Sequence, residues 1–556
     1  MKRFSLALIL CGTAFAQAPY DAVLSGGRIV DGTGNAWFYG DLAIRDGKIA
    51  RIAPPGLLKN APALERIDVT GLVVAPGFID IQSQSRAEFL IKDGRVISKV
   101  TQGVTTEIMG EGYSNAPANE KTMSAEPGLG RSTSNAFEGP HGFDAWLRAM
   151  KAHGTSANFG SFVGAATIRQ YVKGMAQGAP TASEVEVMQT LVRQAMEDGA
   201  FGIGSALIYP PGNYATTAEL GAMAKAMSPY GGVYITHMRS EADQFLEAID
   251  EAMEIGRTGG VPVEIYHLKA SGTRNWPKMR LAIAKINQAR AAGVDISADM
   301  YPYTAGGTGL TAVLPPWTAA DDKLFDNLAN PQVRAKIRAE MQSQKTDWEN
   351  MGQLAGPEGI LIVGIEKDEN RKYLGKRLSE IAVMMNEDWM DAAMDLILSE
   401  HRRVETIYFM MSEDNVKLQL QQPWIKIGTD ASGLDPDQTK GLAHPRAYGT
   451  FPRILGKYVR DENVLPLEDA IRKMTSAVAR RLSIQDRGVL QEGLWADIAV
   501  FDPKTIIDHA TYEQPHQLST GVRYVFVNGV AVVRDGKHTG ALPGQIVRGP
   551  GYVPAQ

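Results

Sequence analysis

Short apolar runs alternate with amphipathic stretches through most of the chain, and this alternation limits the possible folds more than any other feature. In one stretch Phe245, Ile249 and Met253 recur every fourth residue, as on the buried face of a helix. The apolar runs are residues 73–81, 104–109, 159–164, 202–208, 233–236, 261–266, 294–301 and 425–429. Strands that alternate with helices predict a parallel sheet with crossover helices. We therefore predict an α/β fold, a TIM-like (β/α)8 barrel, with a doubly wound open sheet as the alternative.

Both ends of the chain have the pattern of β structure instead. β-branched runs of strand length occur at residues 21–30, 41–52, 496–501 and 524–533. Two such segments at opposite ends of a chain indicate one small β-sandwich domain formed by both chain ends. The alternation is interrupted after residue 310, which indicates an insertion on the barrel. The predicted domains are a signal peptide at 1–16, a β-sandwich at 17–73 and 485–556, and a barrel at 74–484 with an insertion at about 310–405.

The first residues have the pattern of a secretory signal peptide. Lys2 and Arg3 precede an apolar run at 4–10, and Ala14-Phe15-Ala16 follows as an A-x-A cleavage pattern. We therefore expect a secreted or periplasmic protein. No later stretch is long and apolar enough for a membrane span. The single cysteine, Cys11, lies in the signal, so the mature chain is expected to have no disulfide, as in bacterial envelope proteins.

The charge balance argues against a nucleic-acid partner. The formal net charge is -5 and the sequence pI is about 6.1, with lysine and arginine scattered along the chain. Proteins that bind nucleic acid usually present a basic surface, and none is indicated here. A small-molecule substrate is the partner we expect, and the sequence leaves the oligomeric state open.

Polar side chains follow many of the apolar runs, where a barrel places its working residues. Two of the nine histidines, His237 and His267, close consecutive runs. A lone histidine there is more often structural, but two histidines with carboxylates at matching positions favour a metal site. The residues delivered at the ends of the runs are Gln82, Gln84, Glu111, Ala165, Tyr209, His237, His267, Lys269, Tyr301 and Asp430.

Several of these residues have a structural alternative. Asp430 could cap a helix N-terminus or act as a base, and Glu111 could be a loop charge or a ligand. Lys269 stands two residues after His267, so strand alternation would point both side chains to one face. It could be a structural ion-pair lysine or a contact to substrate or oxyanion. Tyr209 and Tyr301 could be pocket walls or donors to an oxyanion.

An ordered set of motifs resembles the amidohydrolase superfamily and, within it, the D-aminoacylases (N-acyl-D-amino-acid deacylases). The resemblance covers nearly the whole chain after residue 16. Its motifs include Gly27-Arg-Ile-Val-Asp-Gly32, Ala75-Pro-Gly-Phe-Ile-Asp80, Gln102-Gly-Val-Thr-Thr-Glu107, Thr236-His-Met-Arg239, His267-Leu-Lys-Ala-Ser-Gly272, Asp299-Met-Tyr-Pro-Tyr-Thr304 and His444-Pro-Arg-Ala-Tyr-Gly-Thr-Phe-Pro-Arg453. The resemblance implies a barrel beside a small β-sandwich, and metal-dependent hydrolysis of the amide in N-acyl-D-amino acids.

The resemblance also implies a role for each candidate residue. Zinc would be held by Glu111, His237 and His267, with Glu111 where the best-known members carry a cysteine, and it would activate water. Asp430 would move the proton of that water to the departing amine. Arg446 would grip the substrate carboxylate, and Lys269 and the tyrosines at 209 and 301 would line the substrate site.

One part of the family pattern is missing. The family carries His-x-His where this chain has Gln82 and Gln84, and a third-strand histidine where it has Ala165. A glutamine oxygen is a poor zinc ligand, so we expect one divalent metal per chain and a second site that is absent or weak. Manganese or iron could replace zinc. The alternatives are a non-catalytic or metal-poor relative that only binds its ligand, and a hydrolase of dipeptides or cyclic amides.

Overall fold

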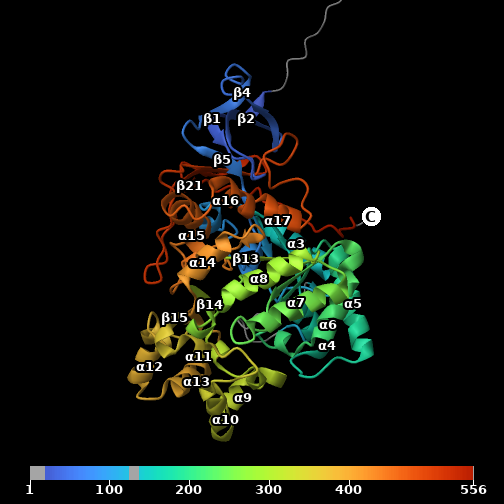
Figure 1. Ribbon diagram of the computed structural model, residues 1–556, viewed down its shortest axis with the longest axis vertical. Helices are drawn as coiled ribbons and strands as arrows, with labels where there is room; N and C mark the ends of the chain where they lie inside the picture. The colour runs from blue at the N-terminus through green and yellow to red at the C-terminus, as the bar shows by residue number, and fades with distance from the viewer. Residues whose placement is uncertain (1–18, 124–136, 555–556) are drawn as a thin grey trace, which may run out of the picture.

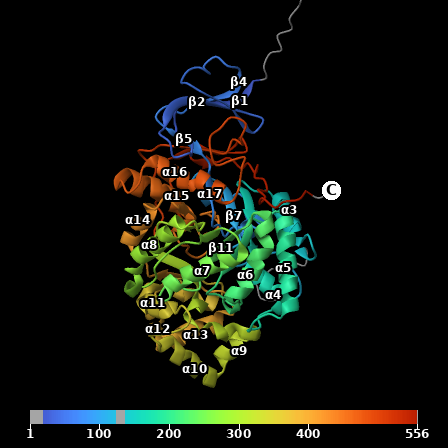
Figure 2. The same cartoon turned by 45° about the vertical axis from the view of Figure 1, so that its right-hand side comes forward.

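The computed structural model describes residues 19–123 and 137–554 (Figure 1). The predicted signal peptide, residues 1–16, and its Cys11 lie outside the described residues. A sheet built from both chain ends, a central barrel and an insertion follow one another along the long axis of the molecule (Figures 1 and 2). In the described ranges, no helix has both the length and the apolarity that crossing a membrane requires.

Parallel strands form the barrel. They are β6 (Phe78–Asp80), β7 (Val104–Met109), β8 (Asn158–Ser161), β9 (Val163–Gly164), β10 (Gly202–Ala206), β11 (Val233–His237), β12 (Val263–Ile265), β13 (Ile296–Met300) and β17 (Ile425–Ile427). Each is paired in parallel with the next, apart from a break between β8 and β9 where Phe162 donates its N–H to the Met109 carbonyl. The Asp430 N–H donates to the Gln82 carbonyl at 2.7 Å and joins β17 to β6. The fold is therefore the predicted (β/α)8 barrel rather than the open sheet.

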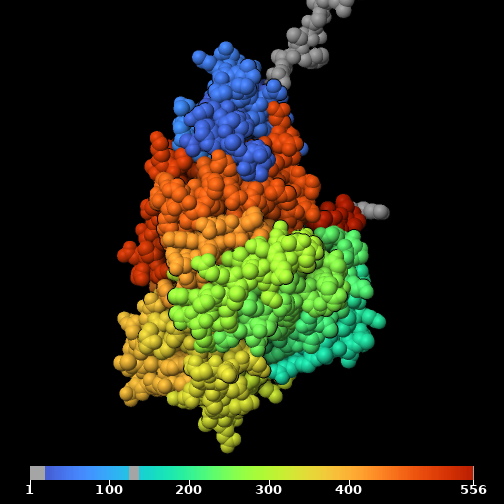
Figure 3. All heavy atoms as spheres, in the orientation of Figure 1, coloured from blue at the N-terminus to red at the C-terminus, as the bar shows by residue number. Residues whose placement is uncertain are grey.

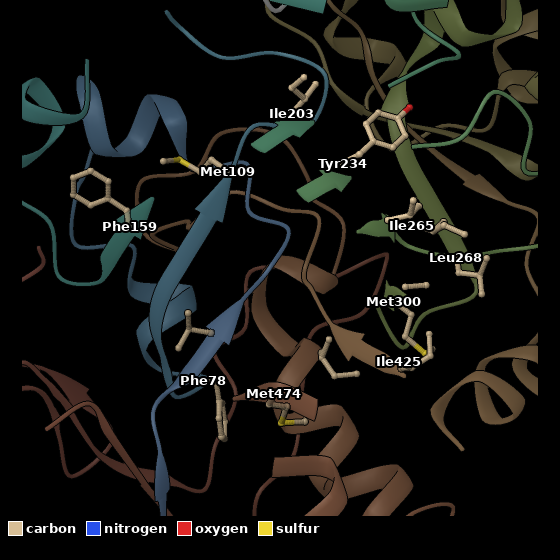
Figure 4. Packing of buried hydrophobic residues seen from close by; sticks show 14 of the residues in the cluster. Phe78, Met109, Phe159, Ile203, Tyr234, Ile265, Leu268, Met300, Ile425 and Met474 are labelled. Carbon is tan, nitrogen blue, oxygen red and sulfur yellow. The ribbon is translucent and has the colours of Figure 1, made fainter. Parts of the chain in front are cut away.

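Helices cover the outside of the barrel. They are α1 (Arg86–Leu90), α2 (Ile97–Val100), α3 (Gly142–His153), α4 (Ala165–Lys173), α5 (Ala182–Glu197), α6 (Thr217–Met227), α7 (Phe245–Gly259), α8 (Lys278–Ala291), α14 (Glu413–Leu420), α15 (Arg446–Arg453), α16 (Leu467–Met474) and α17 (Ser476–Arg481). As the spacing predicted, Phe245 and Ile249 on α7 are buried and Met253 is half-buried. Figure 4 shows labelled core side chains of successive strands, from Phe78 to Ile425, following one another around a ring. Burying each such side chain stabilises the fold by about 1.5–3 kcal/mol.

The two chain ends form one hydrogen-bonded sheet at one end of the molecule (Figure 3). Its strands are β1 (Tyr20–Ile29), β2 (Phe38–Arg45), β3 (Lys48–Ala53), β4 (Ala63–Asp68), β5 (Val73–Pro76), β18 (Ile498–Phe501), β19 (Val522–Val527), β20 (Val530–Arg534) and β21 (Lys537–His538). The antiparallel pair of β5 and β18 joins the two ends. The small β domain therefore needs both termini, as predicted.

The insertion lies between β13 and β17 and has its own core. It comprises β14 (Ala305–Gly309), β15 (Ile360–Gly364), β16 (Glu405–Phe409), α9 (Leu324–Ala329), α10 (Pro331–Gln342), α11 (Met351–Ala355), α12 (Leu378–Met385) and α13 (Trp389–Glu400). β14 and β15 pair with β16 in a small antiparallel sheet. The insertion begins just after the carboxyl end of β13, and its residues Thr308, Glu349 and Arg403 line the cavity at that mouth of the barrel, where the candidate site lies.

Candidate metal centre

Three predicted ligands meet at the carboxyl ends of neighbouring strands. His237 is the last residue of β11, His267 lies two residues after β12, and Glu111 lies two residues after β7. Glu111 Oε1 is 3.2 Å from His237 Nδ1 and 3.1 Å from His267 Nε2. One ligand atom from each residue lies within 4.8 Å of the others. A carboxylate oxygen and two imidazole nitrogens that converge in this way fit a zinc-like divalent cation.

The charges around the three ligands also favour a cation. Burial and the nearby Lys269 ammonium disfavour the charged form of His267, but the carboxylates of Glu241 and Glu111 outweigh them and raise its pKa to about 10. Burial likewise disfavours the Glu111 carboxylate, yet His267 and His237 hold the pKa of Glu111 well below its usual range. The surroundings therefore stabilise positive charge between these side chains, whether a proton or a metal ion carries it.

Glu241 lies next to both histidines, on the side away from Glu111, and is not among the residues predicted from the sequence. Its Oε1 is 3.0 Å from His267 Nδ1 and its Oε2 is 3.6 Å from His237 Nε2. Burial opposes ionisation, but Lys269 and the two histidines lower the pKa of Glu241 to about 2. A carboxylate in this place fixes the orientation and tautomer of metal-binding imidazoles. The sequence signal that could have identified Glu241 is its position four residues after His237, a histidine at the end of a strand.

Lys269 is paired with Glu241. Its Nζ donates to the two Glu241 oxygens at 2.8 and 2.7 Å, and the side chain is 4% exposed. Nζ also lies 2.6 Å from His267 Nδ1, so the ammonium and the Glu241 carboxylate border the same ring nitrogen. Of the two roles considered for Lys269, the structure therefore shows the ion pair, which lies at the wall of the cavity described below.

Asp430 and Arg446 form a close pair beside the ligands. Asp430 follows β17 in a left-handed conformation with φ 49°, and Arg446 begins α15. Arg446 Nη1 is 2.8 Å from Asp430 Oδ2, although the direction of the N–H does not suit a hydrogen bond. The Arg446 guanidinium lies 4.6 Å from the centre of the Tyr301 ring. Burial raises the pKa of Asp430, while Arg446 acts in the opposite direction.

Arg446 keeps unused hydrogen-bonding capacity. Its Nη2 donates to the Gly307 carbonyl at 3.3 Å, but Nε and Nη1 have no hydrogen-bond partner among the described residues. The residue is 5% exposed. Buried donors without partners are costly, so a ligand carboxylate that accepts from this guanidinium would be favoured here.

The two predicted tyrosines are walls of the same space. The Tyr209 ring lies 5.5 Å from the His237 ring, and the Tyr301 ring lies 6.2 Å from the His267 ring. Burial raises the pKa of both phenols, so both are protonated donors at neutral pH. Ala165, in place of the third-strand histidine, is the first residue of α4 and offers no ligand.

The glutamines reach the same carboxylates. Gln82 Nε2 and Gln84 Nε2 each donate to Glu111 Oε2 at 2.7 Å. Gln84 Nε2 also lies 3.1 Å from Asp430 Oδ1 and donates to it. The two positions of the missing His-x-His motif therefore face Glu111 with amide hydrogens, and neither glutamine points away from the site.

All of these residues except Gln82 and Ala165 line one cavity of ≈ 2550 Å³. Pockets for small ligands usually occupy roughly 300–1,000 Å³, so the space accepts an acylated amino acid. The insertion supplies much of the wall, including Thr308, Glu349 and Arg403. Glu349 was also missed from sequence: its Oε2 accepts the Glu241 N–H at 2.6 Å, and burial with the nearby Glu241 charge raises its pKa to about 8.

Comparison with known proteins identifies the relatives. A model of the amidohydrolase family matches residues 164–533. The chain belongs to the amidohydrolase family. This amidohydrolase is 35% identical to a D-aminoacylase of Alcaligenes xylosoxydans xylosoxydans over 95% of this chain and 98% of the relative. It is 34% identical to an N-acyl-D-glutamate deacylase of the same organism, over 96% and 97% of the two chains. The predicted relationship to D-aminoacylases is confirmed.

Two solved structures share the fold of this amidohydrolase. An N-acyl-D-glutamate deacylase from Bordetella bronchiseptica, complexed with zinc and a phosphonate inhibitor that mimics the tetrahedral intermediate, has a TM-score of 0.78 and 32% identity over 96% of this chain and 100% of that chain. A D-aminoacylase has a TM-score of 0.79 and 33% identity over 95% and 100%. The latter is described as having a binuclear metal centre with one-metal activation and second-metal attenuation.

Proposed function

We propose that this amidohydrolase cleaves the amide bond of N-acyl-D-amino acids, using one divalent metal ion, zinc in the first instance. The observation that carries the proposal is the convergence of Glu111, His237 and His267 at one strand end, with Asp430 and Arg446 alongside. The solved N-acyl-D-glutamate deacylase that is complexed with zinc and with a mimic of the tetrahedral intermediate supports it.

Glu111 Oε1, His237 Nδ1 and His267 Nε2 would hold the ion. A divalent cation there supplies Lewis-acid activation of the amide carbonyl and of water. Glu241 Oε1 accepts a hydrogen bond from His267 Nδ1, and its Oε2 lies 3.6 Å from His237 Nε2, so this carboxylate keeps the two imidazoles aimed at the ion. Lys269 keeps Glu241 ionised. The role of Lys269 is therefore to position Glu241 and the histidines, without contact to the substrate.

Asp430 is placed to move protons. In the proposed reaction it takes a proton from the attacking water and gives it to the departing amine, which positioned carboxylates do with gains of about 10²–10⁴ in rate. Tyr209 and Tyr301 are neutral donors that can hydrogen-bond the oxygen of the tetrahedral intermediate.

Arg446 would select substrates with a carboxylate. Its guanidinium has donors without hydrogen-bond partners and can bind a ligand carboxylate, and this fixes the α-carbon relative to the scissile amide. Since the same guanidinium lies against Asp430, a bound carboxylate and the base share one positive charge. We propose that this arrangement sets the handedness of the accepted amino acid.

The export of the chain remains part of the proposal. The basic and apolar pattern of residues 2–16 leads us to expect cleavage after Ala16 and a periplasmic or secreted mature protein. Mass spectrometry of the protein recovered from the envelope fraction would test it, since an uncleaved cytoplasmic chain contradicts the expectation.

The proposed function is tested by turnover and metal content together. Protein purified without chelator is assayed on N-acetyl-D- and N-acetyl-L-amino acids and on amides without a carboxylate. We expect about one metal per chain, turnover of the D-series, and an Asp430→Asn variant that keeps its metal but loses at least about 10²-fold in kcat. Asp437→Asn, at an exposed position on the same loop, is the matched control.

Other outcomes would identify the alternatives. Metal-bound protein that binds N-acyl-D-amino acids without turnover would indicate a binding protein. Preference for dipeptides or for cyclic or carboxylate-free amides would indicate a hydrolase with another substrate. Metal-free protein that still cleaves the N-acyl-D-amino acids would contradict the proposed chemistry.

A further inference from the structure

The two oxygens of Glu111 are divided between different partners. Oε1 faces His237 and His267 at 3.2 and 3.1 Å. Oε2 instead accepts hydrogen bonds from the Gln82 and Gln84 amides, both at 2.7 Å. The Glu111 side chain is only 8% exposed, so these contacts settle which oxygen is left to bind a cation.

The amides must present hydrogen to Glu111. An amide oxygen at 2.7 Å from a carboxylate oxygen would place two electron-rich atoms in contact, whereas an amide N–H satisfies the anion. The Gln82 side chain is buried at 1% exposure, and its Oε1 is left without a hydrogen-bond partner among the described residues. The side chain therefore keeps its donor on Glu111 although its own oxygen is unsatisfied.

The backbone holds both glutamines in place. Gln82 N–H donates to Asp80 Oδ1 at 3.1 Å, and the Gln84 N–H donates to the Ala431 carbonyl at 3.1 Å. The Gln84 contact ties the segment after β6 to the segment after β17, on which Asp430 lies. Gln84 Nε2 then bridges the two carboxylates, with 2.7 Å to Glu111 and 3.1 Å to Asp430.

A second cation between Glu111 Oε2 and Asp430 Oδ1 would need the place that these amides occupy. Cations require lone pairs from their ligands, and an amide NH₂ group offers none. Neutral donors can still offset the closeness of two carboxylates, because each N–H carries partial positive charge. The amides therefore reduce the repulsion between the two carboxylates without binding an ion.

We propose that Gln82 and Gln84 are positioning residues that replace a second metal ion. They restrict Glu111 to one ligand oxygen, hold it in register with Asp430, and make the single-metal state independent of excess metal. The proposal rests on the proposed function, and it contrasts this chain with the D-aminoacylase described as attenuated by a second metal.

The direct test is metal stoichiometry under excess zinc. Wild-type protein is dialysed against a series of zinc concentrations, and bound zinc is counted by elemental analysis. We expect a plateau at one ion per chain for the wild type and a second ion for the Gln82→His/Gln84→His variant. The matched control is Gln421→His/Gln514→His, which adds two histidines at exposed positions and should stay at one. A wild-type plateau at two would overturn the proposal.

The positioning role needs variants that remove the donors and add no ligand. Gln82→Leu/Gln84→Leu should keep one site but bind zinc about 10- to 100-fold more weakly, as when groups that orient a metal ligand are lost. Should that variant fail to fold, Gln82→Asn/Gln84→Asn keeps the amide but shortens its reach and should weaken zinc in the same direction. Zinc affinity unchanged in a folded variant would show that the glutamines only fill space.

Activity gives an independent readout. Excess zinc should leave wild-type kcat unchanged and should lower the kcat of Gln82→His/Gln84→His. Wild-type kcat that falls with zinc while the second ion binds would contradict the proposal. If no substrate is turned over, stoichiometry and affinity still decide it, so failure of the proposed function is distinguishable.

Discussion

Replacing Glu241 by glutamine separates its two proposed tasks. Glu241 is 1% exposed and holds the buried Lys269 ammonium at 2.7 and 2.8 Å as well as His267 Nδ1 at 3.0 Å. Removing its charge leaves Lys269 buried without a counter-charge, which costs about 3–5 kcal/mol of stability. Replacing the carboxylate behind the imidazoles by a weaker, neutral amide acceptor should weaken metal binding about 10- to 100-fold, equivalent to about 1.4–2.8 kcal/mol.

Two further variants keep the two effects apart. Glu241→Leu/Lys269→Met removes both charges, so it should regain most of the stability lost in Glu241→Gln while the metal defect remains. The matched control is Glu219→Gln, which breaks the equally buried pair with Arg169 away from the cavity. It should lose stability but keep normal metal affinity.

The assays are denaturant unfolding of the metal-free proteins and zinc competition with a chromophoric chelator. The reasoning about imidazole orientation is refuted if both Glu241 variants bind zinc as the wild type does. The reasoning about the buried charge is refuted if Glu241→Gln unfolds at the wild-type denaturant concentration.

Three other predictions follow from the same geometry. Arg446→Met should lower kcat/KM about 10- to 100-fold for substrates with a carboxylate and not for amides without one, since charged hydrogen bonds are worth about 1.5–3 kcal/mol; Lys440→Met, at an exposed position on the cavity rim, is the control in the same assay. Burial raises the pKa of Glu349 from 4.5 to about 8, so the free energy of unfolding of the wild type should fall relative to that of Glu349→Gln as pH rises from 4.5 to 8. Unfolding curves of the two proteins that show the same pH dependence would contradict this prediction. Zinc at about 1,000 times its Kd should raise the unfolding free energy by about 4 kcal/mol in the wild type and much less in His237→Ala. Calorimetry that shows the same zinc-dependent stabilisation of both proteins would contradict this prediction.

The fold and the convergence of the three candidate ligands could be predicted from the sequence because both follow from local patterns. Alternating apolar runs identify the strands, and the carboxyl ends of parallel strands meet at one mouth. Glu111, His237 and His267 each follow such a run, so their meeting in the structure was predictable. The sheet of the chain ends was equally readable, although the pairing of β5 with β18 could be known only from the structure.

The missed residues act through tertiary contacts that leave no sequence period. Glu241 lies in a loop beyond β11, and its meeting with Lys269 depends on how two loops fold over the barrel. Glu349 comes from the insertion and reaches the same place from 108 residues away along the chain. Gln82 and Gln84 are predicted from the sequence to be poor metal ligands, but their hydrogen bonds to Glu111 Oε2 can be known only from side-chain geometry.

Anomalous diffraction at the zinc edge, on crystals grown with excess zinc, tests the central claim most directly. We predict one strong peak within bonding distance of Glu111 Oε1, His237 Nδ1 and His267 Nε2, at about 2.0–2.2 Å from each. Absence of a peak among these three atoms, with zinc bound elsewhere on the chain, would contradict the account.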